Sequence, residues 1–206
     1  MIVCKIGVEK GKIIDGTGLN KLTFINMPTP TIGVGQGRFG EDCLDKSGSA
    51  FINVALKKPI TEFTASYWIN VRSIKTEWFE PFNFNSTANF MYIHSSKGGV
   101  WYQYYGAEVE RVAVPLNKWI HVYINIGKDH QIFYFDGVQY ETRSSDSPII
   151  RSFQLFGSNS YINCDCKMSN IVIWDKWKDF TGVPTNYIGV VSRLYINENK
   201  QTFGVI

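Results

Sequence analysis

The strongest constraint on the fold is the alternation of apolar and polar residues across residues 119–126. A period of two places neighbouring side chains on opposite faces of an extended strand. The alternating apolar residues are Ile120, Val122, Ile124 and Ile126. Residues 127–130 have the composition of a turn, residues 132–135 predict the returning strand, and Asp136-Gly137 closes it. This stretch therefore predicts consecutive antiparallel strands inside an all-β domain.

Short strand patterns recur along the chain, and helical periodicity is almost absent. The other predicted strands are residues 2–8, 49–56, 62–73, 89–95, 99–106, 152–158 and 169–176. Two stretches rich in Gly, Asp, Asn and Pro, residues 15–23 and 29–49, are predicted to be loops between short strands. Regular strands with turns between them are typical of an antiparallel two-sheet sandwich or jelly roll. A chain of 206 residues fits one such domain.

Charge and hydropathy exclude several classes of partner. The net charge is only +3 and the Lys and Arg residues are scattered, so the sequence does not indicate nucleic-acid binding. No run approaches the roughly 18 apolar residues that a membrane span requires. The first 14 residues do not resemble a secretory signal peptide. We therefore expect a soluble protein that stays in the cytoplasm or is released by lysis.

Four cysteines, Cys4, Cys43, Cys164 and Cys166, are expected to be free thiols. Cys164 and Cys166 lie two residues apart, on one face of a strand, where disulfide geometry rarely allows a bond between them. Their spacing does not match a zinc site, because the other two cysteines are isolated. A bond from Cys43 to Cys164 or Cys166 remains open as an alternative.

Six short motifs, in order between about residues 15 and 175, resemble a laminin-G-like domain of the concanavalin A-like jelly-roll superfamily. They are DGTGLNKLT from Asp15, GRFGEDCLDKSGSAFINV from Gly37, ITEFTASYWINVRS from Ile60, LNKWIHVYINI from Leu116, IFYFDGVQ from Ile132 and MSNIVIWDKWK from Met168. The resemblance implies two antiparallel sheets, one of them concave. It also implies that Trp119 and His121 belong to the fold and pack between the sheets. His94 and His130 are isolated and do not indicate a site.

The resemblance implies a jelly roll over residues 1–180, and residues 181–206 are predicted to form a C-terminal β-hairpin extension. Residues 175–186 read as a connection, and apolar runs at 187–196 and 202–206 form the two hairpin strands. An isolated hairpin is marginal in water, and its edges can pair with another chain. The hairpin is predicted to mediate assembly of a homo-oligomer, with completion of the domain's own sheet as the alternative.

Related jelly rolls include glycoside hydrolases that carry a Glu-x-Asp-x-x-Glu motif, which this sequence lacks. The nearest pair, Glu108 and Glu110, shares one face of an extended strand beside Arg111, and a salt-bridged exposed strand explains it. Glu77 and Glu80 differ by three positions and would face opposite ways. The sequence therefore predicts a protein that is not an enzyme, with no catalytic residues, and a glycoside hydrolase is the weakest alternative.

Laminin-G-like domains often bind calcium through one or two Asp side chains and backbone carbonyls. Asp42 and Asp45, beside the glycine-rich stretch, and Asp129 in a hairpin turn are the candidate ligands, because calcium prefers hard oxygen donors. Asp136 is discounted, since Asp-Gly suits the turn for backbone reasons alone. The sequence contains no ordered Asp-x-Asp-x-Asp loop. Calcium is therefore an optional cofactor in this interpretation.

The aromatic run at residues 99–106 is the best candidate for a recognition surface. On a strand, Trp101, Gln103 and Tyr105 face one way, and the nearby run from Trp78 is too apolar for an ordinary solvated loop. A sugar ring stacks on Trp or Tyr, and amide side chains fix its hydroxyls. The alternative is that both runs only fill the two faces of the sheet.

Two classes of function follow. The first is a binding module that recognises a glycan or a cell-surface protein, and the second is a structural subunit that packs against copies of itself or a scaffold. The single compact domain and the terminal hairpin resemble small phage virion or tail proteins with laminin-G-like jelly rolls. The prediction is a non-enzymatic attachment or decoration protein of a virion. Its partners would be a glycan, a cell-surface protein or other virion subunits, and cytoplasmic localisation is the alternative.

Overall fold

A computed structural model describes residues 1–25, 31–47, 49–75, 78–83, 91–96, 99–104, 111–127, 130–143, 149–157 and 164–186. For Trp78, residues 99–104 and several other strand positions it describes the backbone only. The described residues contain strands, turns and bends and no helix. Consequently, none of them belongs to a helix that could cross a membrane.

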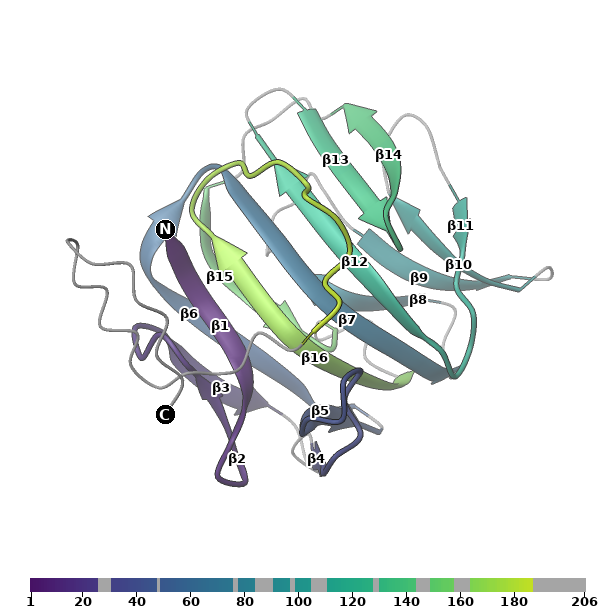
Figure 1. The fold of residues 1–206 in the computed structure, drawn as a ribbon, viewed down its shortest axis with the longest axis horizontal. Coiled ribbons are helices and arrows are strands. Elements are labelled where there is room, and N and C mark those ends of the chain that lie inside the picture. The colour runs from purple at the N-terminus through teal and green to yellow at the C-terminus, as the bar shows by residue number, and fades with distance from the viewer. Residues whose placement is uncertain are drawn as a thin grey trace.

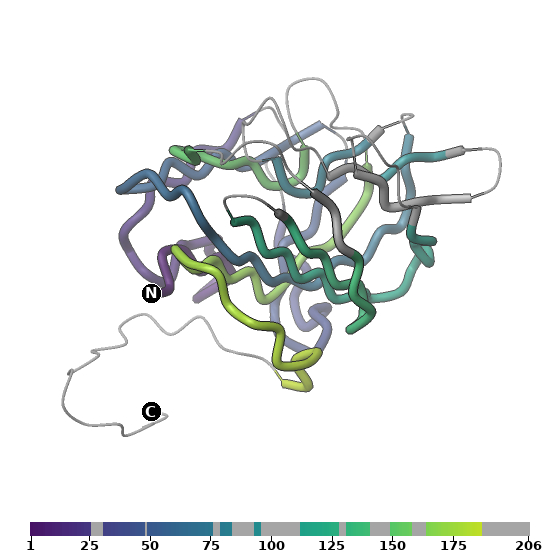
Figure 2. Tube along the Cα trace, turned by 90° about the horizontal axis from the view of Figure 1, so that it is seen from above, coloured from purple at the N-terminus to yellow at the C-terminus, as the bar shows by residue number. Residues whose placement is uncertain are grey.

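The described strands form two antiparallel sheets stacked face to face (Figure 1, Figure 2). In sheet A the order is β14-β13-β12-β7-β16-β1-β2, with β5 also paired to β16 and β4 to β5. Sheet A comprises β1 (Ile2–Glu9), β2 (Lys12–Asp15), β4 (Thr31–Gly33), β5 (Cys43–Lys46), β7 (Phe63–Ile74), β12 (Trp119–Ile126), β13 (His130–Phe135), β14 (Val138–Arg143) and β16 (Cys164–Trp174). Sheet B has the order β11-β10-β9-β8-β15-β6-β3. It comprises β3 (Lys21–Ile25), β6 (Phe51–Ile60), β8 (Trp78–Asn83), β9 (Met91–Ser96), β10 (Gly99–Tyr104), β11 (Arg111–Ala113) and β15 (Ile150–Leu155). The prediction of an all-β, two-sheet sandwich is confirmed.

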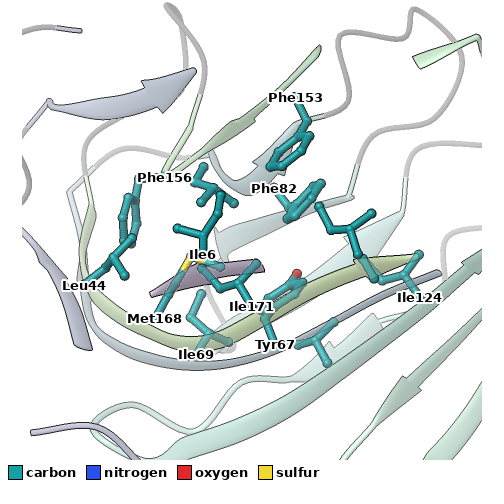
Figure 3. Close-up of a cluster of buried hydrophobic side chains, with 14 of the residues drawn as sticks. Ile6, Leu44, Tyr67, Ile69, Phe82, Ile124, Phe153, Phe156, Met168 and Ile171 are labelled. Carbon is teal, nitrogen blue, oxygen red and sulfur yellow. The ribbon is translucent and has the colours of Figure 1, made fainter. Parts of the chain in front are cut away.

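The core lies between the sheets and is built by the alternation seen in the sequence. On β12, Ile120 pairs with Ile69 of β7 and Val122 pairs with Tyr67, and all four side chains are buried. Phe82 of sheet B stacks on Tyr67 of sheet A, with ring centroids 5.8 Å apart (Figure 3). Stacked rings add to the free energy gained by burying their area. The predicted register of the central strand is therefore confirmed.

The outer face of sheet A is covered by the chain itself. Residues 175–186, here called the covering segment, run across the outside of β7 and β12 (Figure 1). The Lys178 N–H donates to Thr64 Oγ1 (2.9 Å), and Asn125 Nδ2 donates to the Lys178 carbonyl (2.6 Å). A Cβ added at Gly127 would lie 3.2 Å from the Trp177 ring, so glycine permits the close approach. The predicted connection is thus a packed part of the domain.

His121 belongs to the fold, but its predicted place between the sheets is wrong. Its ring lies on the outer face of sheet A, fully buried, 5.2 Å from the Trp68 ring and 6.3 Å from the Phe180 ring. Its Nε2 is hydrogen-bonded to Ser66 Oγ (2.9 Å). Burial lowers the His121 pKa to about 4, because a charged imidazolium would lose its hydration there. The ring is therefore neutral at pH 7. Trp119 of the same strand is half-buried.

The DGTGLN motif forms a hydrogen-bond network centred on Asp15. The carboxylate accepts bonds from the backbone N–H groups of Lys5, Thr17 and Asn20 at 3.0–3.1 Å. It also accepts bonds from Thr17 Oγ1 (2.6 Å) and Asn20 Nδ2 (2.9 Å). The motif therefore ties the turn after β2 to β1. A buried carboxylate needs hydrogen-bond donors around it, and the side chains of Thr17 and Asn20 supply two of them.

Two stretches predicted as loops contain strands. β3 begins at Lys21, within the first stretch, and β4 and β5 lie within the glycine-rich second stretch. Their short length weakened the signal in the sequence.

Asp136 and Gly137 have φ values of 47° and 85°, as a two-residue hairpin turn requires. All four cysteines are free and buried. Of the predicted C-terminal hairpin extension, residues 181–206, the part from residue 187 onward lies outside the described residues.

Candidate ligand-binding face

The outer face of sheet B carries a row of polar side chains across four strands. Thr23 of β3 pairs with Asn53 of β6, Asn53 pairs with Gln154 of β15, and Gln154 pairs with Asn83 of β8. Their sequence neighbours Ile52, Val54, Phe82, Phe153 and Leu155 are buried in the core. Because strand side chains alternate between faces, the polar row points away from the core.

Two neighbouring amides in this row are available to a ligand. The side chains of Asn53 and Gln154 are half-buried and have no hydrogen-bond partner among the described residues. The Gln154 Oε1 atom is itself buried. A buried polar atom without a partner costs free energy, so a donor placed there by a ligand would bind favourably.

Asn83, at the end of the row, is held by a carboxylate. Its Nδ2 donates to Glu80 Oε2 at 2.5 Å, and both residues are buried. A register shift between Phe79 and Phe82 of β8 brings Glu80 and Asn83 to the same outer face. Glu77, Glu108 and Glu110, the other carboxylates considered from the sequence, lie outside the described residues.

The predicted aromatic residues lie on the next strands of the same sheet. Trp78 of β8 pairs with His94 of β9, and His94 pairs with Trp101 of β10, which places all three in one row. Ile93, next to His94, is buried in the core, so His94 belongs to the outer face. Gln103 occupies the same strand as Trp101 and pairs with Tyr92. Tyr105 lies outside the described residues.

The amide row and the aromatic row meet on β8 and together form what we call the sheet B platform. It comprises Asn53, Gln154, Asn83 and His94, with Trp78 and Trp101 as register positions. Trp78, Trp101 and Gln103 of these strands were predicted from the sequence, whereas Asn53 and Gln154 were not. A signal existed, because SAFINVAL and SFQLFGS each place one amide between two apolar core residues. It could not be interpreted without knowing that the two strands pair.

The predicted calcium ligands are engaged by the protein. Arg72 binds both oxygens of the Asp45 carboxylate, Nη2 to Oδ1 at 2.5 Å and Nη1 to Oδ2 at 3.2 Å. Asp42 Oδ1 accepts a bond from the Gly35 N–H (2.9 Å), and Asp129 lies outside the described residues. Within the described ranges, no three His, Cys, Asp or Glu side chains are grouped to hold a metal. A carboxylate bound by an arginine fork is a poor calcium ligand, so Asp45 does not fit the ion.

Solved structures with the same fold include domain 4 of AbnA, an extracellular arabinanase of Geobacillus stearothermophilus, in complex with arabinotriose. It is 12% identical, with a TM-score of 0.65, and the alignment covers 85% of this chain and 92% of that one. Botulinum neurotoxin type C, whose cell entry depends on interaction with two ganglioside molecules, is 10% identical with a TM-score of 0.58. Trypanosoma rangeli sialidase is 14% identical with a TM-score of 0.56. The neurotoxin and sialidase alignments each cover 86% of this chain, but they cover only 48% of the neurotoxin chain and 31% of the sialidase chain.

No curated protein matches this sequence. A laminin-G-type family model, described as the concanavalin A-like lectin/glucanases superfamily, matches residues 45–181, about two thirds of the chain. The matched region runs from β5 to the covering segment and contains most strands of both sheets. The two-sheet fold and this match together show that the chain belongs to the concanavalin A-like lectin/glucanases superfamily.

Proposed function

We propose that the protein is a carbohydrate-binding domain whose ligand lies on the sheet B platform. The observation that carries this proposal is the pair of facing amides, Asn53 and Gln154, without hydrogen-bond partners among the described residues. A buried amide oxygen without a partner costs free energy, which a ligand hydroxyl placed there would recover.

The chemistry of the platform suits a sugar. An amide offers both a donor and an acceptor, and a sugar hydroxyl can satisfy either of them. The carbonyl oxygen of Gln154 has no hydrogen-bond partner among the described residues, so it would accept a bond from a hydroxyl donor once the side chain turns towards the ligand. The register row of Trp78 and Trp101 on the neighbouring strands adds residue types on which sugar rings stack. The strand register thus places amide and tryptophan positions on neighbouring strands of one sheet.

The structural comparisons support a binding role by analogy. The arabinanase domain has almost the same extent as this chain and was solved with a bound saccharide. At 12% identity the similarity concerns the fold, so the site is argued from the residues of this chain.

We propose that binding occurs without cleavage. The carboxylate described on the platform, Glu80, is buried and accepts a bond from Asn83. Glycoside hydrolysis needs two carboxyl groups placed across the scissile bond, and the sequence lacks the motif that supplies them in related jelly rolls. The role in attachment to or decoration of a phage particle, the homo-oligomer and the location in a virion stay sequence-based predictions.

A glycan microarray probed with the full chain tests the proposed function. We expect at least one class of saccharide to be bound, and prolonged incubation of that saccharide with the protein should release no shorter products. Absence of binding to every saccharide on the array would contradict the binding role. Release of products, lost in a Glu80→Gln variant that still folds, would contradict the non-enzymatic role.

A further inference from the structure

A cavity in the domain arises from an irregularity in β6. Ile60 of β6 pairs with Ile150 of β15, and Ala55 pairs with Ser152. Five steps along β6 therefore correspond to two steps along β15, so three extra residues are accommodated in β6 between these pairs. The pairing of β6 with β3 ends at the same point, at Ala55. A large bulge of this kind redirects side chains away from the sheet.

The bulge forms one wall of a cavity with a volume of about 430 Å³. The opposite walls are the start of β1 and the turn before β3, and the start of β1 lies beside the end of β6 (Figure 1). The lining includes Leu19 from the turn, Leu56, Lys57, Lys58 and Pro59 from the bulge, and Thr61 after β6. This volume falls within the range of small-molecule sites. The cavity is separate from the polar row on the outer face of sheet B, since none of the row's residues lines it.

Asn20 fixes the walls relative to one another. Its Nδ2 donates to the Val3 carbonyl of β1 (2.7 Å), and its Oδ1 accepts from the Lys57 N–H of the bulge (3.1 Å). The same Nδ2 also donates to Asp15, the buried centre of the DGTGLN hydrogen-bond network. The Asn20 side chain therefore connects β1, the DGTGLN hydrogen-bond network and β6. A cavity whose walls are held in this way loses little conformational entropy on binding.

The charges at the cavity favour an anion. Lys57 and Lys58 are exposed, and neither ammonium group has an ion pair or a hydrogen bond among the described residues. Asp175, the acidic residue of the lining, is already paired with the amino group of Met1 (2.5 Å). Lys57 and Lys58 thus line the same cavity as the apolar residues Leu19 and Leu56. A ligand that matches both features carries a carboxylate and an apolar ring face.

We propose that this cavity binds a sugar that bears a carboxylate, with Lys57 and Lys58 holding the carboxylate and Leu19 and Leu56 contacting the ring. The saccharide nature of the ligand rests on the proposed function, whereas the carboxylate is inferred from the cavity itself. The protein would then bind a neutral part of a glycan on the sheet B platform and an acidic sugar at the cavity.

D-glucuronate and D-glucose form a matched pair of probes, because they differ only in the carboxylate. The full chain would be titrated with each, and with sodium hexanoate, which has a carboxylate but no sugar hydroxyls, using two-dimensional NMR. The test variant is Lys57→Gln/Lys58→Gln. The control is Lys10→Gln/Lys12→Gln, which removes the same charge from exposed positions at the β1–β2 turn.

We expect glucuronate to shift resonances of the cavity residues and to bind at least about tenfold more tightly than glucose or hexanoate. The test variant should lose about tenfold or more in affinity for glucuronate, and the control variant should bind like the wild type. Three results would each overturn the proposal: no binding of glucuronate, equal loss in both variants, or hexanoate binding as tightly as glucuronate. If the microarray still shows binding that depends on Asn53 and Gln154, only this inference fails and the proposed function stands.

Discussion

Asn125 in sheet A and Asn53 in sheet B are asparagines in strands, and both face away from the core between the sheets. Asn125 is 1% exposed, and it bonds to the Lys178 carbonyl and to Thr64. Asn53 is half-buried and has no hydrogen-bond partner among the described residues. The two side chains are chemically the same, and their roles differ because a segment of the chain covers only one of them.

The outer faces of sheet A and sheet B differ in the same way as these two asparagines. On sheet A, the covering segment places Phe180 on Tyr134, with ring centroids 4.3 Å apart, and bonds to polar side chains of β7 and β12. Several buried polar atoms of sheet A, including Trp68 Nε1, His121 Nδ1 and Asn70 Oδ1, also lack partners among the described residues, and Asn70 is half-buried like Gln154. On sheet B, the unpartnered amides belong to half-buried residues. The two faces therefore differ in the covering segment, which bonds to polar side chains of sheet A, whereas Asn53 and Gln154 on sheet B have no such bonds among the described residues.

The largest expected effect is at the shared core. Val122→Asp places an unpaired charge among fully buried side chains, at an expected cost of more than about 4 kcal/mol, so soluble folded protein should be lost. The control is Val138→Asp on β14, where the side chain is 56% exposed and the variant should fold normally. Soluble yield and circular dichroism measure both. A folded Val122→Asp protein would show that this register of β12 is incorrect.

The second effect is a pH dependence that arises under the covering segment. His121 has a folded-state pKa of about 4, below its usual value of 6.5, so the unfolded state binds the proton more tightly. The stability contributed by this neutral ring is present above pH 6.5 and is lost as the pH falls towards 4. Between pH 7 and pH 4.5 we expect a loss of about 2–3 kcal/mol that a His121→Gln variant does not show.

Urea unfolding of the wild type and the His121→Gln variant at both pH values gives the difference directly, since the other titrating groups are common to both proteins. An equal loss of stability in the two proteins would mean that the ring is accessible to protons in the folded state. The covering segment would then not protect sheet A as described.

The third effect compares the two asparagines. Asn125→Ala should lower the free energy of unfolding by about 1–3 kcal/mol, because the Lys178 carbonyl and Thr64 lose a partner in a buried place. Asn53→Ala should change it by less than about 0.5 kcal/mol. Chemical denaturation measures both values. Equal destabilisation by the two substitutions would remove the distinction between the faces.

The smallest effect concerns calcium. Since Arg72 binds both oxygens of Asp45, we expect millimolar calcium to leave the melting temperature unchanged. A rise in the melting temperature, abolished by Asp45→Ala, would show that the arginine is displaced and that the ion binds after all.

Much of the fold could be predicted from the sequence because the signals are local. The alternation around Val122 determines both the strand and the face that enters the core, and the ordered motifs indicate the sandwich. The placement of His121 could not be predicted in this way. A buried outward-facing histidine requires a cover, and the cover comes from residues more than 50 positions later in the chain.

The candidate site was only partly predictable for the same reason. Trp78 and Trp101 stood out by residue type, whereas Asn53 and Gln154 are ordinary residues that acquire meaning by pairing across β6 and β15. The cavity with Lys57 and Lys58 depends on a bulge, and no single stretch of sequence reveals a mismatch in the length of two paired strands.

The central claim is that sheet B recognises a glycan and sheet A does not. The most direct test is the glycan microarray signal of the wild type compared with that of Asn53→Ala/Gln154→Ala, with the melting temperature measured alongside. We expect the double variant to melt like the wild type and to lose binding to the saccharides that the wild type recognises. Unchanged binding by a folded double variant would contradict the account.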